Sequence, residues 1–424
     1  MINLISKYFK KYKKNNFLLS EIKKIAEERK IDKIFNSILN YSETSELRYV
    51  GGIVRKIIKN EKVDDIDLST NLTPKEVCEA LKKNNIRYFE SGIEHGTITA
   101  KIGENKFEIT TLRKDVSTDG RHAKVEYSKD WLDDASRRDF TFNSIYSDYD
   151  GNLYDPFNGK IDLLSGKVKF IGDPEKRIKE DYLRIIRYIR FHLNYSKIKH
   201  NIELKKIIKQ NIDGISKISS ERLLDELKKI ILSEGFTNIN SDSFAEEIIK
   251  LIYPELINLN VFKNCNDFLK QIIKEKDILF LISLMIIDDT DNSEYFIFKY
   301  NISNEDKKKI RFLNNIFIKK LDKEFFNEKN LWKMFYYHGK NYLNDMIDLK
   351  IILNKKTDQK LIKLKDFFNK QDIPILEIKA KTLIDKYNFK EGKELGAKLK
   401  EIEDFWIKNS FKISDKELNK IINN

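Results

Sequence analysis

The chain has 424 residues, 41% of them hydrophobic, and its 80 lysines and arginines against 67 aspartates and glutamates give a formal net charge of +13. The length predicts more than one domain, and the hydrophobic content excludes a disordered basic tail. A folded chain with this positive balance favours a polyanionic partner, and nucleic acid is the first candidate.

The sequence shows neither membrane-spanning nor secretory signals. No apolar run approaches the ~20 residues that cross a bilayer, and the start MINLISKYFKKYKKNN lacks the apolar core of a signal peptide. The two cysteines, Cys78 and Cys265, stand far apart without a CxxC pattern, which argues against a disulfide framework and structural zinc. We therefore expect a cytoplasmic protein. An organelle presequence is the alternative, because the start is basic and has no acidic residue through Ser20.

The glycine distribution divides the chain near residue 172. Ten of the fifteen glycines lie between Gly51 and Gly172, among short β-like runs at 47–50, 97–102 and 106–112. Beyond this point helical spacing dominates, and we expect helices to start at Ser243, paired with Glu246, and at Ser303, paired with Asp306. The sequence thus predicts a small mixed α/β unit followed by helices.

The segment RYVGGIVRKII at 48–58 predicts a strand, a turn and a helix. Gly51 and Gly52 would let backbone amides approach an anion at the helix start, and Arg55 lies one turn further on, where it could meet a phosphate. Alone the pattern is weak, because a Gly-Gly turn often serves geometry only.

The segment VDDIDLST at 63–70 places Asp65 and Asp67 on one face of a strand, with Ile66 toward the core. Two carboxylates this close repel each other unless a cation lies between them, and hard oxygen ligands suit Mg²⁺ bound together with substrate phosphates. The alternative is a solvated acidic turn. The apolar residues around the pair and the preceding glycine turn favour the metal site.

Glu108, in KFEITTL at 106–112, would project from a strand toward the neighbour that carries the two aspartates. Three carboxylates could hold two metal ions for in-line phosphoryl transfer. An exposed edge-strand glutamate is an equally good interpretation of the spacing alone.

The motifs follow one another in a fixed order: GGIVRK, DDIDLST, HGTITA, FEITTLRKDVSTDGRHA, DWLDDASRRDFTFNSIY, DPFNGKIDL, IGDPEKRIKEDYLRIIRYIRF and ISSERLLDELKKI. Over roughly residues 45 to 235 this ordered set resembles the class II tRNA nucleotidyltransferases, the CCA-adding enzymes. One departure is Lys56, where the family usually has Asp, and it puts a local salt bridge or turn contact in doubt.

The resemblance implies an α+β nucleotidyltransferase head, similar to the palm of DNA polymerase beta, followed by an all-helical neck, body and tail. We expect the head with an N-terminal helical segment at 1–150, a neck with a nucleotide-recognition helix at 151–235, and a tRNA-binding body and tail at 236–424. It further implies CTP and ATP as substrates, tRNA as partner, and Mg²⁺ in a two-metal site held by Asp65 and Asp67, with Glu108 as a third catalytic carboxylate.

Two further segments acquire roles from the resemblance. In RRDFTFN, one of Arg137 and Arg138 would clamp the triphosphate, and the other would hold the head through Asp139; Asn143 completes the nucleotide-binding set. The stretch that contains Asp119 and Arg121 looks like the family's mobile loop. His122 in this stretch is expected to be a loop residue, because no two of the five histidines stand at ligand spacing.

The segment EDYLRIIRYIR at 180–190 predicts the base-reading site. Asp181 and Arg184 are three residues apart, hence adjacent on an ideal helix, and offer an acceptor beside a donor. Such a pair accepts C and A, which present an amino donor beside a ring-nitrogen acceptor, and rejects U and G. Arg187 could support this face, whereas Arg190 would emerge about 180° from Asp181 and needs a bent helix or another partner. A surface ion pair is the commoner meaning of the spacing, and only the motif context favours base reading.

Three functions remain in competition. A CCA-adding enzyme is our interpretation, because TTLRKDVSTDGRHAKVEY and DWLDDASRRDFTFN look closer to CCA-adding members than to poly(A) polymerases. A bacterial poly(A) polymerase or an A-adding or CC-adding relative uses the same head. A non-catalytic RNA-binding protein fits the positive charge, but the intact Asp65 and Asp67 speak against it.

Overall fold

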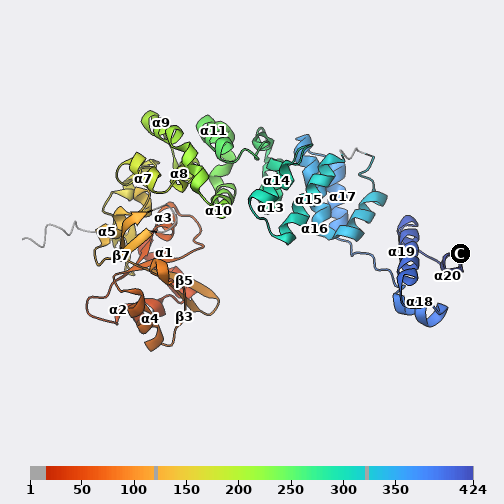
Figure 1. Ribbon diagram of the computed structural model, residues 1–424, viewed down its shortest axis with the longest axis horizontal. Coiled ribbons are helices and arrows are strands. Elements are labelled where there is room, and N and C mark those ends of the chain that lie inside the picture. The colour runs from red at the N-terminus through yellow and green to blue at the C-terminus, as the bar shows by residue number, and fades with distance from the viewer. Residues whose placement is uncertain (1–15, 119–122, 320–323, 424) are drawn as a thin grey trace, which may run out of the picture. The chain divides into compact units, whose positions relative to one another are not determined.

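A computed structural model describes residues 16–118, 123–319 and 324–423. The chain divides into two compact units, Met1–Tyr253 and Pro254–Asn424, shown from red to green and from green to blue in Figure 1. Among the described residues, no helix is long and apolar enough to cross a membrane.

The first unit is built on a mixed sheet of seven strands within the described residues, in the order β3-β4-β5-β2-β1-β8-β9. Only β2 and β5 pair in parallel; the other neighbours are antiparallel. A separate hairpin joins β6 to β7. The strands are β1 (Leu47–Val50), β2 (Asp67–Thr70), β3 (Arg87–Gly92), β4 (Thr97–Ile102), β5 (Asn105–Thr111), β6 (Arg113–Thr118), β7 (Ala123–Tyr127), β8 (Tyr146–Ser147) and β9 (Leu153–Tyr154).

A row of buried aliphatic side chains fixes the register of the central strands. Leu68 of β2 lies opposite Ile109 of β5, which lies opposite Ile98 of β4, and none of the three is exposed. Helices α2 and α4 contact each other and the sheet (Figure 1), and the hydroxyl of Ser37 donates to the carbonyl of Ala80 between them. Because side chains alternate along a strand, this row also decides which residues face the other way.

Eleven α-helices are described in the first unit. They are α1 (Asn16–Arg29), α2 (Asp32–Leu39), α3 (Gly52–Lys59), α4 (Pro74–Lys83), α5 (Trp131–Ser136), α6 (Gly159–Ser165), α7 (Pro174–Glu180), α8 (Leu183–Tyr195), α9 (Ile202–Gln210), α10 (Ser220–Ile231) and α11 (Ser243–Ile252).

An aromatic cluster fastens α8 to the segment between α5 and β8. Phe191 of α8 makes edge-to-face contacts with Phe140 and Phe142, at centroid distances of 5.4 and 5.2 Å. Tyr195, one turn further along α8, contacts Phe142 at 6.0 Å. Aromatic pairs of this kind contribute about 0.5–1.5 kcal/mol each beyond their burial, so α8 is held firmly against the head.

The second unit is helical throughout its described residues. Its α-helices are α12 (Asp267–Glu275), α13 (Ile278–Ile286), α14 (Asn292–Lys299), α15 (Asn304–Ile318), α16 (Glu328–Asn354), α17 (Gln359–Asn369), α18 (Ala380–Tyr387), α19 (Lys393–Lys408) and α20 (Asp415–Asn423). The long α16 is interrupted at Gly339, whose φ of 78° lies outside the helical range.

Buried ion pairs hold α16 to its neighbours. The carboxylate of Asp348, which has no exposed surface, pairs with Lys276 and with Lys365, the latter at 2.7 Å. Asp345, one turn earlier, pairs with Lys276 at 2.8 Å and with Lys309 at 2.7 Å. Every aspartate in this group has a lysine partner, as burial of a charge requires.

The two expected helix starts fare differently. Ser303 caps α15, and its hydroxyl accepts from the amide of Asp306 at 3.1 Å, as predicted. The prediction of Ser243 as a cap is wrong by one residue: Asp242 caps α11 and accepts from the amide of Ala245 at 3.0 Å. The carboxylate stands one position earlier and reaches the third helical amide, which leaves Ser243 inside the helix.

The predicted mixed unit followed by helices is confirmed. The head sheet runs to Tyr154, and the compact unit that contains it ends at Tyr253. The finer boundaries after residues 150 and 235 stay predictions.

Candidate active site

Three carboxylates gather at one end of the parallel strand pair. Asp67 is the first residue of β2, and Glu108 of β5 lies directly opposite it. Neighbouring strands are separated by about 4.8 Å, so the two carboxylates are close neighbours. Asp65 precedes the strand instead of lying on it, yet it lines the same cleft as Asp67, and Ile66 between them is buried, as predicted.

The electrostatics of the carboxylates reflect their crowding. Desolvation raises the pKa of Asp67, and Asp65 adds to this, while Arg138 and Arg55 oppose it. Desolvation likewise raises the pKa of Glu108, with further contributions from Asp67 and Asp65. Carboxylates that raise the pKa of a neighbour favour a cation between them, and an all-oxygen donor set fits Mg²⁺ better than a soft metal.

The glycine turn directs the start of α3 toward the same cleft. Gly51 has φ +66°, a conformation that favours glycine, and a Cβ there would lie 3.4 Å from the carbonyl oxygen of Asn143. Gly51 and Gly52 both line the cleft, as the sequence predicts. The turn therefore lets the chain pass close to the 143 segment and exposes the first helical amides, which carry the positive end of the helix dipole.

Arg55 is held inside the protein as well as facing the cleft. Its side chain is buried and donates to the amide oxygen of Asn143 and, at 3.2 Å, to the hydroxyl of Tyr195. Its guanidinium also lies 4.9 Å from the ring centre of Phe191. The residue expected to meet a phosphate thus links α3 to α8 at the floor of the cleft.

Lys56, the departure from the family pattern, makes a salt bridge of its own. Its ammonium lies 2.9 Å from the carboxylate of Asp64, the residue directly before Asp65. The side chains are 27% and 59% exposed, so the pair is worth about 0.2–1 kcal/mol. The turn therefore keeps a salt bridge although position 56 is a lysine, because Asp64 supplies the opposite charge.

Arg137 and Arg138 share a partner that the sequence analysis missed. Both pair with Asp134, at 2.6 and 2.9 Å, and Asp134 is fully buried. Burial acts to raise the pKa of Asp134, but Arg138 and Arg137 outweigh it and hold the pKa below its usual range. The expected pair to Asp139 is wrong for both arginines, because Asp134 on α5 lies closer; only Arg138 lines the cleft.

Asp139 and Asn143 belong to a second network. The carboxylate of Asp139 accepts from Arg187 at 2.6 Å and from the amide of Asn143 at 2.7 Å. Burial acts to raise the pKa of Asp139, and Arg187 and Asn143 outweigh it and lower the pKa to about 2. Arg187 therefore ties α8 to the head, and all three residues line the cleft.

Asp181 and Arg184 are not paired with each other. Helix α7 ends at Glu180 and α8 begins at Leu183, and Asp181 between them is extended, with φ −152° and ψ 104°. Its carboxylate pairs with Arg222 of α10 at 2.8 Å, whereas Arg184 pairs with Glu180 at 2.7 Å. The prediction of an adjacent helical pair is wrong, although both side chains line the cleft.

The break between α7 and α8 also explains Arg190. An angle of about 180° from Asp181 holds only for one continuous helix, and here Asp181 lies outside α8. Arg190 lines the cleft and pairs with the buried carboxylate of Glu226 at 2.5 Å. The different partner that the sequence analysis required is therefore Glu226.

One face of α10 contributes residues that the sequence analysis did not single out. Arg222, Glu226 and Lys229 recur at intervals of four and three, the helical spacing that places side chains on one face. Only the segment ISSERLLDELKKI as a whole had been noted. This spacing was visible, but nothing in the sequence showed which face of the helix meets the head.

These elements enclose a cleft of about 520 Å³ that is lined by eight lysines and arginines and four aspartates. The acids Asp65 and Asp67 belong to the head, and Asp181 to the junction of α7 and α8. Glu108 lies beside Asp67 in the sheet and is not part of the cleft lining. Asp119 and Arg121 lie outside the described residues.

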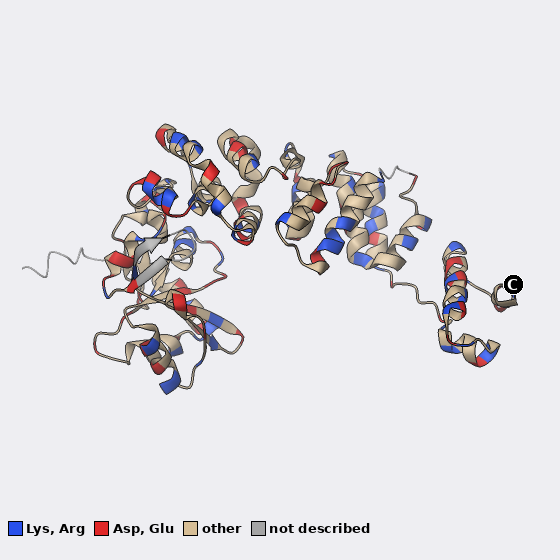
Figure 2. Ribbon diagram, in the orientation of Figure 1, with Lys and Arg blue, Asp and Glu red and all other residues tan. Residues whose placement is uncertain are grey.

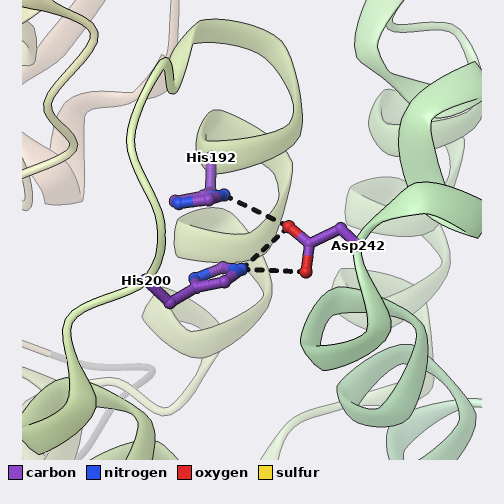
Figure 3. Close-up of side chains that lie close together, drawn as sticks. All are labelled: His192, His200 and Asp242. Carbon is purple, nitrogen blue, oxygen red and sulfur yellow. Dashed lines mark hydrogen bonds and ion pairs between the residues drawn. The ribbon is translucent and has the colours of Figure 1, made fainter.

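A second cluster of titratable groups joins α8 to the residues before α9 and α11 (Figure 3). The imidazoles of His192 and His200 stack at a centroid distance of 3.5 Å, and both face Asp242, at 3.4 and 2.8 Å. Tyr188 bonds the remaining ring nitrogen of His200 at 2.9 Å. The two histidines, which have no ligand spacing in the sequence, come together only through the fold.

The geometry of this cluster fits a hydrogen-bonded clamp. Nδ1 of His192 and Nε2 of His200 both contact the same oxygen of Asp242, Oδ2, at 3.4 and 2.8 Å. Burial acts to raise the pKa of Asp242, but hydrogen bonds from His192 and His200 outweigh it and hold the pKa below its usual range. Asp242 thereby fastens α8 and the 196–201 segment to the start of α11.

Comparison with known families matches two regions of the chain. Residues 47–169 match the model of the poly A polymerase head domain, and residues 201–258 match a model described as the probable RNA and SrmB-binding site of polymerase A.

The chain is also similar to named proteins along most of its length. It is 34% identical over 405 residues to the mouse (Mus musculus) mitochondrial CCA tRNA nucleotidyltransferase 1, covering 89% of this chain and 86% of that protein. It is 31% identical over 317 residues to the CCA-adding enzyme of Staphylococcus haemolyticus, covering 73% and 74% of the two chains.

Solved structures share the fold. The CCA-adding enzyme of Bacillus stearothermophilus in complex with CTP superposes with a TM-score of 0.69 at 18% identity, covering 93% of this chain and 96% of that one. A tRNA nucleotidyltransferase complexed with a primer tRNA and an incoming ATP analog gives a TM-score of 0.59 at 20% identity, covering 82% and 98%.

The Lys56–Asp64 pair can be tested by exchanging its charges. We expect Lys56→Asp and Asp64→Lys each to lower the free energy of unfolding, and the double variant to recover about 0.2–1 kcal/mol of that loss by restoring opposite charges. Urea unfolding of the four proteins measures the coupling. Strictly additive losses would show that the contact contributes nothing.

The Asp242 clamp predicts a specific pH dependence of stability. A carboxyl with a lowered folded pKa stabilises the protein above its unfolded pKa of about 3.9, and this contribution disappears as the pH falls through the folded value. We therefore expect Asp242→Asn to be less stable than wild type at pH 7, and the difference in stability between the two proteins to be smaller near pH 3. Thermal unfolding at both pH values measures it, with Asp213→Asn on the exposed surface as control. A gap that does not change with pH would contradict the assignment.

Proposed function

The chain belongs to the family of CCA-adding tRNA nucleotidyltransferases, and we propose how its cleft carries out that activity. The enzyme adds C, C and A to the 3′ end of tRNA from CTP and ATP. The observation that carries the proposal is that one cleft holds the carboxylates Asp65 and Asp67 at one wall and Asp181 with Arg184 at another.

The carboxylates provide the reaction centre. Asp65 and Asp67 would hold two Mg²⁺ ions together with the phosphates of the nucleotide, and Glu108, opposite Asp67, would orient the attacking 3′ hydroxyl. When bound, the metal ions lower the charge barrier between an attacking hydroxyl and a polyphosphate. Burial is the largest cause of the raised pKa values of Asp67 and Glu108, and Asp65 adds to both, a repulsion that a cation would relieve.

The basic residues of the cleft neutralise the triphosphate. Arg138 faces the cleft while Asp134 fixes its guanidinium, so the donor fork is oriented before the nucleotide arrives. The start of α3 from Gly52 onward offers backbone amides to the same charge, whereas the amide of Gly51 donates to the carbonyl of Ile145. Arg55, already bonded to Asn143 and Tyr195, positions this wall and adds its charge to it.

Base selection rests on Asp181 and Arg184, held by separate partners. Arg222 occupies one oxygen of Asp181 and the amide of Leu183 occupies the other, so the carboxylate has a fixed orientation and spare lone pairs. Glu180 and the carbonyl of Arg177 fix Arg184 in the same way. The acceptor and the donor can then read the amino group and ring nitrogen of C and A, although they are not an adjacent helical pair.

The helices provide the RNA contacts in this proposal. Figure 2 shows lysines and arginines on the helices of both units, and residues 201–258 match an RNA-binding model. We expect the affinity for tRNA to fall steeply with salt, as phosphate contacts require. The cytoplasmic location expected from the sequence stays a prediction, and the mouse relative is named as mitochondrial.

A poly(A) polymerase is the nearest alternative, because the head model that matches this chain is named for that activity. The carboxylates serve both reactions equally. The similarity over most of the chain to enzymes named for CCA addition favours CCA addition.

Removal of a carboxylate proposed to bind the metal should abolish nucleotide addition without weakening the binding of tRNA. We expect Asp65→Ala and Asp67→Ala to stop addition of both C and A, and to leave tRNA affinity unchanged or slightly raised, because a negative charge near phosphates is lost. Single-turnover incorporation and equilibrium tRNA binding measure the two effects. Robust incorporation with Mg²⁺ by either variant would refute the metal assignment.

Loss of the Asp181 carboxylate should impair selection more than chemistry. Asp181→Ala removes the acceptor for the amino groups of C and A, and a good base-reading contact is worth about 1–3 kcal/mol. We expect discrimination of CTP and ATP against UTP to shrink by roughly ten- to a hundredfold. Relative kcat/KM values for the four nucleotides measure it. Unchanged preference would reduce Asp181 to a structural partner of Arg222.

A further inference from the structure

Helix α10 runs along the cleft from one functional end to the other. Arg222, at its start, contacts Asp181 of the base-reading site, and Lys229, seven residues later, lines the cleft together with Asp65 and Asp67. At 1.5 Å per residue these two positions are separated by roughly 10 Å along the helix axis. Glu226 lies between them on the same face and pairs with Arg190.

Lys229 differs from the other basic residues of the cleft. Each of the other seven lysines and arginines in the lining has a hydrogen bond or an ion pair with a protein group. Lys229 has neither among the residues that the structure describes, and its side chain is exposed to the cleft. An unpaired ammonium with three donors is therefore available to a ligand.

The charges around Lys229 indicate what kind of ligand it would take. The cleft lining holds eight lysines and arginines against four aspartates, so its net charge is positive and attracts an anion. Lys229 lines this cleft together with Asp65 and Asp67, so its charge lies at the end of the cleft that holds these carboxylates. A phosphate near the carboxylates satisfies both observations.

We propose that Lys229 binds a phosphate at the reacting end of the cleft, either in the triphosphate of the incoming nucleotide or in the last phosphodiester of the acceptor strand. The inference rests on the proposed function, because it takes the nucleotide's base to lie at Asp181. A nucleotide bound there extends its phosphates along α10 toward Lys229, so one helix contacts both ends of the substrate. Lys229 is then a binding residue for the reacting groups, in addition to the arginines fixed by the head.

The test compares Lys229→Met with Lys228→Met. Lys228 is the adjacent residue on α10, lies about 100° around the helix and does not line the cleft. Both variants remove one positive charge, so they differ only in the position of the lost charge. The KM values for CTP and ATP and the affinity for tRNA lacking CCA are measured for both variants at several salt concentrations. Thermal unfolding confirms that both proteins remain folded.

We expect Lys229→Met to weaken the binding of one of these substrates by about ten- to a hundredfold, as the loss of a charged hydrogen bond does. Lys229→Arg, which keeps the charge, should retain most of the wild-type affinity. A raised KM for CTP and ATP with unchanged tRNA affinity assigns the contact to the triphosphate. A weaker tRNA affinity with a shallower salt dependence assigns it to the acceptor strand.

Equal behaviour of Lys229→Met and Lys228→Met would overturn the proposal and make Lys229 a solvated lysine. A loss of kcat in Lys229→Met with unchanged substrate affinities would overturn it as well, since it would point to an effect on Asp67 alone. The wild-type enzyme separates this inference from the proposed function: if wild type adds C and A, a failure of the Lys229 test concerns Lys229 only.

Discussion

The pairing of β2 with β5 is the constraint on which the site depends. It is the one parallel pair among the described strands of the head sheet, and it brings Asp67 opposite Glu108. Like charges side by side are unfavourable, so this arrangement must be held by something else. The buried row of Leu68, Ile109 and Ile98 does so, because a slip of one residue would turn these side chains out of the core. The hydrophobic core thus maintains the repulsion that a metal site uses.

In the walls of the cleft, by contrast with the neighbouring carboxylates of β2 and β5, opposite charges lie next to each other in pairs. Asp134 holds two arginines, and Glu226 holds Arg190. Buried carboxylates of this kind fix a guanidinium in one orientation, so its reorganisation on substrate binding is small. Asp181 is fixed in the same manner by Arg222. Most cations in the cleft are therefore donors held in one orientation, and Lys229 is the one of the described lining without a hydrogen bond or an ion pair.

Local patterns were sufficient to predict the head side of this site. Strand alternation around Asp67 and Glu108 and the glycine turn at Gly51 depend on neighbours in sequence, and the structure brings these residues to one place. Helix periodicity failed at Asp181, because it assumed one helix where α7 and α8 meet at an extended residue. The partners of Arg137, Arg190 and Asp181 escaped prediction for another reason: spacing does not show which of many acids and bases the fold brings together. The stacked pair of His192 and His200 is the same case.

In the proposed function, the protein itself selects C, C and A without a nucleic-acid template. The most direct measurement supplies the purified enzyme with tRNA that ends before its CCA and with each labelled nucleotide, singly and in pairs. The account predicts two additions from CTP alone, three from CTP with ATP followed by a stop, and none from UTP or GTP. A long run of A from ATP alone, or a stop after two C with both nucleotides present, would contradict it.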